Sequence, residues 1–168
     1  PPARLDDGLW RTLREHGGFP EPFIQASASF RRRWARLRRQ QLLREDLRDL
    51  TRIQDLGQLE HLGTLLDRLS GERLVFANLA QELRVDDKTA RRWVETFCAF
   101  HHGFLVRPWF RNVAKALRKE PKWFLRDWSG IEDAGQRAET LVANHLLKAV
   151  EGWTDLGLGE FALHFIRD

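Results

Sequence analysis

The 168-residue sequence contains no methionine and no tyrosine, and it has a single cysteine, Cys98. Because a natural start codon places a methionine first, we expect the chain to be a piece of a longer protein. One cysteine excludes an internal disulfide framework and is typical of a reducing compartment. No apolar run reaches the length of a membrane span, and no signal peptide is visible. These absences predict a cytoplasmic protein with no membrane partner.

The chain also lacks a phosphate-binding loop of the form Gly-x-x-x-x-Gly-Lys-Ser/Thr. That loop supplies the backbone cradle for the phosphates of ATP in P-loop enzymes. We therefore expect that this chain neither binds nor hydrolyses ATP, holds no cofactor and is not an enzyme by itself.

Reactive side chains are few. Cys98, His101 and His102 form only a loose group, whereas zinc needs three or four ligands in suitable geometry, so we predict no metal site. Cys98 is interpreted as a small core hydrophobe. The acidic pairs stand at predicted helix starts, where carboxylates favour the helix dipole, and we interpret them as caps rather than acid/base dyads. These pairs are Glu45-Asp46, Asp86-Asp87 and Glu132-Asp133.

What the sequence has is large apolar side chains and a mild positive charge. Hydrophobic residues make up 42%, with seven Trp and eleven Phe, which is enough for a packed core. The formal net charge is +4. A charge of this size permits nucleic-acid binding without requiring it.

Apolar residues at helical spacing predict three helices in the first part of the chain, over 5–16, 27–44 and 56–69. The stretch 17–22, with two Gly and two Pro, is predicted to break the chain between the first two helices. The second helix is rich in arginine, and it either follows phosphates, meets an acidic partner or a further domain, or is simply solvated. Its arginines are Arg31, Arg32, Arg33, Arg36, Arg38, Arg39 and Arg44.

The next stretch predicts a winged helix-turn-helix. A short helix over 76–83 is followed by a tight connection, an N-cap at Asp86 and a longer helix that ends near 102–103. Glycine is common in such a turn, but Arg84 stands there, and a positive φ would strain it. Two strands over 104–107 and 122–126, joined by a basic connector, complete the wing, with Pro108 confining the first strand to an edge or an end.

The last part of the chain predicts a helix over 138–149, with an apolar stripe at 138, 141, 142, 145, 146 and 149, and a strand over 161–166. An isolated helix and strand cannot bury both their faces, so we expect the opening of an incomplete α/β domain. The predicted fold class is thus mainly α. It divides into a helical segment (1–70, lid- or linker-like), a winged helix-turn-helix (71–128) and the start of an α/β domain (129–168).

A winged helix that binds duplex DNA places its second helix in the major groove and its wing against the backbone. The alternative is a protein-docking or spacer module whose charges are solvated, because this fold is often reused as a scaffold. The candidate DNA-binding residues are Lys88, Thr89, Arg91, Arg92, Arg111, Lys115, Arg118, Lys119 and Lys122.

A series of motifs resembles the bacterial and archaeal AAA-type ATPases that carry a C-terminal domain of unknown function with a restriction-endonuclease-like core. The resemblance runs through nearly the whole chain. The motifs are, in order, Gly17-Gly18-Phe19-Pro20-Glu21, Leu43-Arg44-Glu45-Asp46-Leu47-Arg48-Asp49-Leu50, Lys88-Thr89-Ala90-Arg91-Arg92-Trp93, Asn112-Val113-Ala114-Lys115, Lys119-Glu120-Pro121-Lys122 and Arg137-Ala138-Glu139-Thr140-Leu141-Val142-Ala143-Asn144-His145-Leu146-Leu147-Lys148.

The resemblance implies a parent protein that binds ATP and Mg²⁺ in a P-loop core preceding Pro1, and whose nuclease-like acidic strand follows Asp168. Of that family's nuclease-like acids, only Glu139 maps onto this chain. The stretch 127–130 is similar to the family's Asp-x-Gly motif but has one residue more. We therefore expect a non-catalytic part of an AAA-type ATPase that contacts double-stranded DNA. The alternative is a module that couples the ATPase core to a protein partner without binding nucleic acid.

Overall fold

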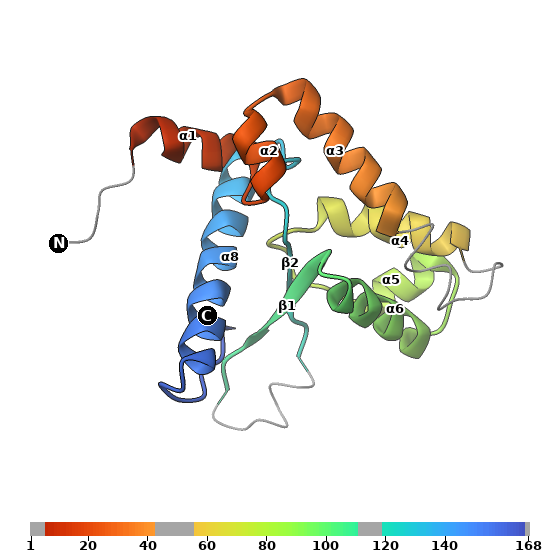
Figure 1. Ribbon diagram of the computed structural model, residues 1–168. Coiled ribbons are helices and arrows are strands. Elements are labelled where there is room, and N and C mark those ends of the chain that lie inside the picture. Colours follow the sequence, from red (N-terminus) through yellow and green to blue (C-terminus); the bar gives the residue numbers. More distant parts are fainter. Residues whose placement is uncertain (1–5, 43–55, 111–118, 167–168) are drawn as a thin grey trace.

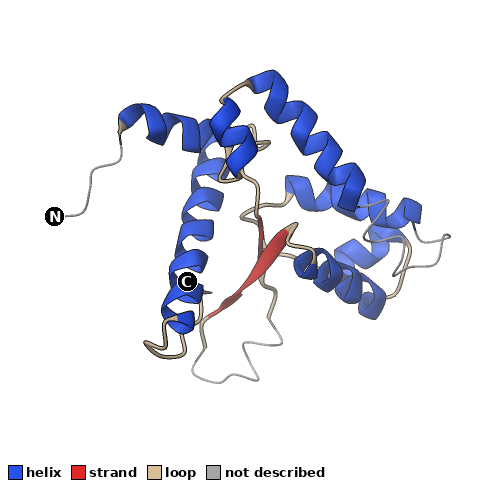
Figure 2. Ribbon diagram, viewed as in Figure 1, coloured by secondary structure: helices blue, strands red, loops and turns tan. Residues whose placement is uncertain are grey.

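The computed structural model describes residues 6–42, 56–110 and 119–166. Its fold is mainly helical with one small sheet, as predicted (Figure 2). The helices are α1 (Asp7–His16), α2 (Pro20–Gln25), α3 (Ala28–Gln41), α4 (Leu56–Arg68), α5 (Phe76–Leu83), α6 (Asp87–Ala99) and α8 (Ala134–Asp155), and the strands are β1 (Gly103–Pro108), β2 (Lys122–Leu125) and β3 (His164–Phe165).

Side-chain caps fix the start of several helices. Ser27 Oγ accepts a hydrogen bond from the amide of Phe30 at the start of α3, at 3.4 Å. Asp133 caps α8 in the same way, its Oδ1 lying 2.7 Å from the amide of Gln136. Asp86 caps α6, which confirms the N-cap predicted there. These caps satisfy backbone donors that have no partner within the helix. Of the predicted acidic caps, Glu45-Asp46 lies outside the described residues.

The predicted break after α1 is real but shorter than expected. Gly17 ends α1 with a φ of 83°, a conformation that favours glycine. The prolines do not continue α1, as predicted, but a short helix that was not predicted begins within this stretch, with Pro20 as its first residue. At that position the missing N–H is not needed and the fixed φ of proline suits the helix.

Helices α4, α5 and α6 followed by the hairpin β1–β2 form the winged helix. A further extended segment at 72–74 pairs with β2 and was not predicted. The amide of Trp123 donates to the carbonyl of Glu72 at 2.9 Å, and the amide of Leu74 donates to the carbonyl of Pro121 at 2.8 Å. Too few residues take part for a periodic pattern to reveal them in the sequence.

The turn between α5 and α6 is made by Arg84 in the left-handed region, with φ 55° and ψ 44°. The positive φ confirms the strain expected where glycine is common. The amide of Val85 donates to the carbonyl of Ala80 at 3.0 Å and closes the turn. The small, buried side chain of Ala80 lets the two helices approach each other.

The hairpin β1–β2 lies between α8 on one side and α4, α5 and α6 on the other (Figure 1). Trp123 and Leu125 belong to the main core, with the leucines of α4 and the aromatic residues of α6. On the opposite face, Phe104 and Phe124 pack with Ala143 of α8. Both faces of the wing are therefore covered.

Of the predicted apolar stripe, helix α8 fully buries only Leu141. Its buried residues are Thr140, Leu141, Ala143 and Asn144. Val142 and Leu146, both placed on the stripe, are about half exposed, at 52% and 50%. The physical reason is that the buried side of α8 supplies polar partners, with Asn144 bonded to Leu125 of β2 and Thr140 bonded to Ser70.

A buried polar network joins α4, β2 and α8. The amide of Leu125 donates to Ser70 Oγ at 3.0 Å, and the carbonyl of Leu125 accepts from Asn144 Nδ2 at 2.8 Å. Ser70 Oγ and Thr140 Oγ1 lie 2.8 Å apart. Side chains thus satisfy both main-chain groups of Leu125, as a neighbouring strand would.

Strand β3 adds to the sheet, which has the order β2-β1-β3. It pairs in parallel with the end of β1, Pro108 facing Phe165, so Pro108 stands at the end of its strand as predicted. The predicted strand over 161–166 is reduced to two residues. Within the described residues, no helix combines the length and the apolar character needed to cross a bilayer.

Hydrogen bonds cross both predicted domain boundaries, which stay predictions. Trp123 Nε1 donates to the carbonyl of Leu66 at 3.0 Å, across the boundary at 70/71. The Asn144 contact crosses the boundary at 128/129. Trp128 Nε1 donates to the carbonyl of Leu13, and its ring lies so close to Gly18 that a Cβ there would stand 2.6 Å away. The motifs at 17–21 and 127–130 therefore pack together.

The polar network predicts a specific cost for Asn144→Leu. This change keeps the side-chain size but leaves the buried carbonyl of Leu125 without its side-chain donor, so the free energy of unfolding should fall by about 1–3 kcal/mol. Denaturant titration measures it. Gln81→Leu, on the exposed face of α5, is the matched control and should change stability by no more than about 0.5 kcal/mol. Equal effects of the two changes would contradict the role assigned to Asn144.

The left-handed turn predicts that Arg84→Gly stabilises the protein. Glycine adopts this conformation without the steric cost that other residues meet, and the gain should outweigh its greater freedom in the unfolded chain by about 0.5 kcal/mol. Arg84→Ala removes the same side chain but keeps the Cβ, and it should give no gain. Thermal unfolding compares the three proteins, and a glycine variant less stable than the alanine variant would be inconsistent with a strained turn.

Candidate functional site

The second helix of the helix-turn-helix, α6, presents a charged face to solvent. Lys88, Arg91 and Arg92 are exposed in its first turns. They are held there because the opposite face of α6 is anchored in the core. The buried residues of that face are Ala90, Trp93, Val94 and Phe97.

Thr89, which was expected to reach a phosphate, is engaged in the helix cap. Its hydroxyl donates to Asp86 Oδ2 at 2.7 Å, and its amide donates to Asp86 Oδ1 at 2.9 Å. The hydroxyl bond, followed by the backbone bond, lowers the pKa of the Asp86 carboxyl. Thr89 therefore fixes the start of α6 and so the direction of its basic residues.

The two arginines of α6 differ in their surroundings. Arg91 Nε lies 2.7 Å from Asp87 Oδ2, and its guanidinium lies 4.1 Å from the ring centre of Phe76. Its position is therefore set by α5 and by its own helix. Arg92 forms no ion pair with the described residues, and it is the arginine with the greater freedom to meet a ligand.

Only some of the residues predicted to form the DNA contacts of the wing lie within the described part of the chain. Arg111, Lys115 and Arg118 lie outside the described residues, whereas Lys119 is exposed. Lys122 Nζ pairs with Glu139 Oε1 at 2.8 Å. The structure thus brings together a residue predicted to contact DNA and the one predicted nuclease-like acid.

Glu139 is about half exposed, at 49%, and it lies beside the left-handed Gly71. Hydrolysis assisted by Mg²⁺ needs several oxygen ligands in near-octahedral geometry. Among residues 6–42, 56–110 and 119–166, no group of three or more His, Cys, Asp or Glu side chains is placed to hold a metal ion. In this part of the chain Glu139 acts as the ionic partner of Lys122.

Cys98 lies against the main core and is half-buried. Burial, followed by the nearby charge of Glu95, raises the pKa of its thiol to about 11. The thiol is therefore protonated at neutral pH and a poor nucleophile. His102, which the sequence places near it, turns instead to Asp67, with 3.1 Å between Nε2 and Oδ1.

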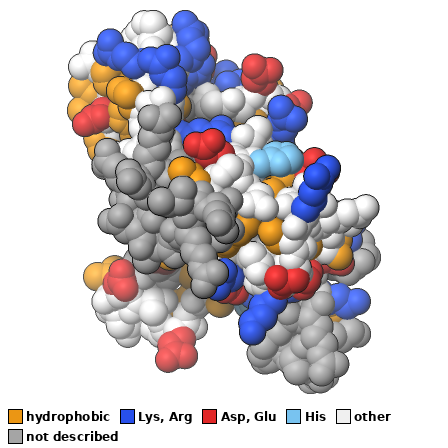
Figure 3. Space-filling view, turned by 90° about the vertical axis from the view of Figure 1, so that its right-hand side faces the viewer, with side chains coloured by type: hydrophobic (Ala, Val, Ile, Leu, Met, Phe, Trp, Pro, Cys, Tyr) orange, Lys and Arg blue, Asp and Glu red, His pale blue; other side chains and the backbone are white. Residues whose placement is uncertain are grey.

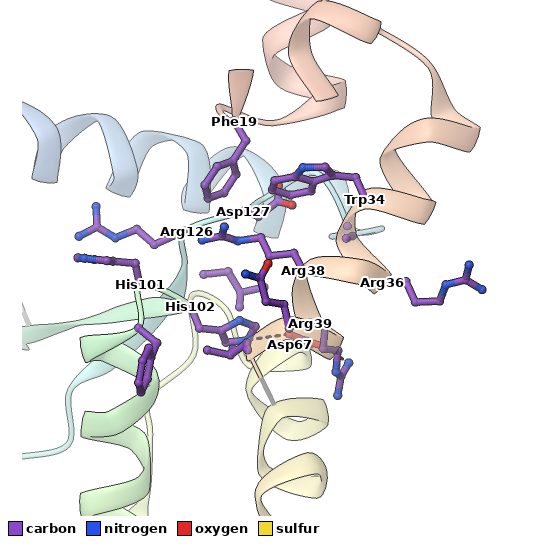
Figure 4. A pocket seen from close by; sticks show the side chains of 16 residues that line it. Phe19, Trp34, Arg36, Arg38, Arg39, Asp67, His101, His102, Arg126 and Asp127 are labelled. Carbon is purple, nitrogen blue, oxygen red and sulfur yellow. Dashed lines mark hydrogen bonds and ion pairs between the residues drawn. The ribbon is translucent and has the colours of Figure 1, made fainter. Parts of the chain in front are cut away.

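A second candidate site was not predicted as a unit. It is a pocket of about 440 Å³ between α3, the end of α4, the turn from α6 into β1, and the segment that follows β2 (Figure 4). We call it the arginine pocket. The charged and aromatic residues that line it are Phe19, Trp34, Arg36, Arg38, Arg39, Asp67, Phe100, His101, His102, Arg126 and Asp127.

On one side of the arginine pocket, the positive charge of Arg39 is neutralised by another lining residue. Arg39 binds Asp67 and Thr64, with 2.5 Å between Arg39 Nη1 and Asp67 Oδ2. Asp67 also meets His102, so it bridges α3 and the α6–β1 turn. These contacts hold the fold together, and the charge of Arg39 is paired with Asp67.

Arg38, the neighbour of Arg39 on α3, differs from it because it is exposed and rests on aromatic rings. Its guanidinium lies 4.5 Å from the ring centre of Phe19 and 5.5 Å from that of Trp34. Trp34 is itself held by a bond from Nε1 to Glu21 Oε2 at 2.7 Å. Arg38 is not ion-paired to any described residue, and it points into the pocket beside Asp127 (Figure 4).

The basic surface continues beyond the arginine pocket along α3. Figure 3 shows Lys and Arg side chains gathered at the top of one face, at the level of α3 in Figure 1. Arg32, Arg33 and Arg36 are exposed on this helix. The arginine-rich run was visible in the sequence, but the pocket needs 19, 67, 101 and 126 beside it, which no local pattern reveals.

Comparison with known proteins places the chain among uncharacterised relatives. Residues 8–132 match the family model described as "Domain of unknown function (DUF8612)". An uncharacterised protein of Mycobacterium bovis and one of Mycobacterium tuberculosis are each 32% identical over 124 residues, which is 72% of this chain. The matched region spans 26% of the length of each of these relatives. No solved structure matches the chain.

Asp127, at the floor of the arginine pocket, predicts a pH-dependent stability. Burial raises the pKa of its carboxyl above the ordinary 3.8, although the amide of Ser129 donates to it. The folded state then holds a proton that the unfolded state releases, so stability falls as pH rises from that value through the folded pKa. Asp127→Asn should be more stable than the natural protein at neutral pH, and this advantage should shrink as pH falls toward 4.

Urea titrations of both proteins between pH 4 and pH 7 measure the difference. Asp133→Asn, which changes an exposed capping carboxylate in the same way, is the control and should show no such advantage at neutral pH. A constant difference between Asp127→Asn and the natural protein across this range would show that the burial of Asp127 does not govern its ionisation.

Proposed function

The chain belongs to the family described as Domain of unknown function (DUF8612), and from this premise we propose that it is a non-catalytic winged-helix module that contacts duplex DNA. The observation that supports this most is the exposed basic start of α6, with Lys88, Arg91 and Arg92 on a helix fixed by its cap and its buried face. This is the part of a helix-turn-helix that meets the major groove in DNA-binding proteins.

The charges on α6 also indicate how strong this contact is. Asp87 and Glu95 are exposed on the same helix, and Asp87 pairs with Arg91. These acids oppose the attraction between the basic residues and DNA phosphates. We therefore expect weak binding that depends on the shape of the duplex more than on its sequence, with a dissociation constant on the order of micromolar at physiological salt.

We further propose that the module works inside a larger AAA-type ATPase that binds ATP and Mg²⁺. The support is the order of the motifs that resemble such ATPases and the length of the mycobacterial relatives, of which the matched region spans 26%. On this proposal the P-loop core supplies the ATPase activity and this chain contributes contacts. Glu139, which pairs with Lys122, remains the candidate acid of a nuclease-like site. Because one carboxylate cannot hold a catalytic metal ion in place, the chain alone should not cut DNA.

A protein-coupling module is the second candidate, and exposed apolar side chains favour it. On α8, Val142, Leu146 and Trp153 are about half exposed, and Leu156 and Leu158 just beyond it are 76% and 65% exposed. Several large apolar side chains exposed on and just after one helix are a feature of protein interfaces when they form one patch. On this reading the basic residues of α6 are solvated.

Removal of both arginines from α6 tests the first proposal. If Lys88, Arg91, Arg92, Lys115 and Lys119 each neutralise one phosphate, the logarithm of the duplex binding constant should fall with the logarithm of salt with a slope of roughly −4 to −5. Arg91→Ala combined with Arg92→Ala should weaken binding and flatten this slope by about two units. Fluorescence anisotropy with a labelled duplex at several salt concentrations provides the measurement.

The control removes the same charge elsewhere. Arg11→Ala combined with Arg14→Ala changes two exposed arginines of α1 and should leave the slope nearly unchanged. If both double variants bind alike, the contact is a general effect of charge and not a property of α6. If the natural chain ignores duplex DNA even at low salt, the coupling module becomes the better account.

A further inference from the structure

We infer that the arginine pocket binds an unpaired nucleotide of single-stranded nucleic acid, with Arg38 meeting a phosphate and the aromatic rings at the pocket meeting a base. This goes beyond the proposed contact of α6 with duplex DNA. It uses a different surface and does not depend on that proposal.

The chemistry of the lining favours an anionic ligand with an aromatic part. Four arginines line the pocket against two aspartates. Asp67 is already held by Arg39 and His102. Asp127 accepts from the backbone of Ser129 at 2.9 Å, and the charge of Arg38 also acts on it without forming an ion pair. Guanidinium groups bind phosphate oxygens with two parallel hydrogen bonds, so the exposed Arg38 is suited to a phosphate.

The aromatic residues distinguish a nucleotide from a bare anion. Phe19, Trp34 and Phe100 line the pocket and are each partly exposed. Alternating basic and aromatic side chains in a groove are typical of surfaces that bind single strands, where bases stack on rings and cations follow the backbone. A cavity of about 440 Å³ lies in the range of small-ligand sites and has the size for a nucleotide unit rather than a base pair.

The surroundings favour a polymer over a free small molecule. Arg36 lines the pocket but its side chain points away from the other labelled lining residues (Figure 4), and Arg32 and Arg33 are exposed on the same helix. Arg32 and Arg36 form no ion pair with the described residues. A positive strip that leads out of the pocket suits a ligand whose negative charges continue beyond it. Duplex DNA does not fit, because its bases are paired and stacked inside the helix and cannot reach the rings.

The test measures binding of a labelled oligodeoxythymidylate by fluorescence anisotropy. Arg38→Gln removes the charge and retains most of the side-chain stem, and it should weaken binding by about tenfold. It should also flatten the salt slope by about 0.7, the value for one phosphate contact on a single strand. Arg11→Gln, on α1, is the matched control and should leave the affinity within about twofold of the natural protein. Equal affinities of both variants would overturn the assignment.

Two further ligands separate the contribution of the base from that of the negative charge. An abasic oligonucleotide of equal length keeps the phosphates and should bind more weakly, because it has no base to stack. Polyglutamate of equal charge should also bind more weakly, since carboxylates on a peptide lack the aromatic part. If either ligand binds as tightly as the oligodeoxythymidylate, the pocket does not recognise a nucleotide.

Duplex DNA of the same length distinguishes this proposal from the proposed function. Arg38→Gln should affect the single strand and spare the duplex, whereas Arg92→Gln on α6 should do the opposite. If Arg38→Gln weakened binding of both the single strand and the duplex, the two ligands would share one surface, and the proposal of a separate site would be wrong. If the natural chain bound the single strand but not the duplex, only the proposed contact of α6 with duplex DNA would be contradicted. Circular dichroism and thermal unfolding of each variant confirm that the fold is retained.

Discussion

Leu125 imposes the constraint on which the arrangement of this structure depends. It is the last residue of β2, and its outward main-chain groups are buried just beyond the segment at 72–74 that pairs with this strand, where none of the described residues continues the backbone pairing. A buried amide or carbonyl without a partner costs about 1–3 kcal/mol. Ser70 at the end of α4 satisfies the amide, and Asn144 in α8 satisfies the carbonyl. The two helices must therefore stay in register with the hairpin.

This constraint connects the two candidate sites. The α4 end that holds Ser70 also carries Asp67, which bridges Arg39 and His102 at the arginine pocket. Helix α8 brings Glu139 to Lys122 on the same strand as Leu125. Helix α6 is anchored by Trp93 and Phe97 in the core that contains Trp123. The exposed basic residues of α6 and the pocket thus stand on one packed framework, and each presents its charges in a fixed direction.

The sequence predicted the elements better than their contacts. Helix ends could be predicted because a capping residue such as Asp86, or a glycine or proline, acts on its immediate neighbours in the chain. The strained turn at Arg84 could be predicted for the same reason. The buried face of α8 was misjudged because hydrophobic periodicity cannot show that Asn144 is buried to satisfy β2 and Thr140 to bond Ser70. Helix α2 was missed because Pro20 both interrupts a helix and begins one.

The candidate sites follow the same rule. The basic residues of α6 were identified from one local motif, although the contacts of Arg91 with Asp87 and Phe76 required the structure. The arginine pocket was not predicted, because its walls come from five segments that are distant in the sequence. Of its features, the sequence showed only the run of arginines on α3. The pairing of Lys122 with Glu139 likewise joins two residues that sequence reasoning had assigned to different activities.

The central claim is that α8 and the winged helix form one cooperative unit through the contacts of Leu125. Native-state hydrogen exchange at increasing denaturant tests this most directly. The account predicts that the amides of Leu125, of Trp123 and of the first half of α8, around 140–146, exchange with a common free energy of opening close to that of global unfolding. Opening of α8 at a much lower free energy than β2 would contradict it, because the helix would then be a separate element resting on the wing.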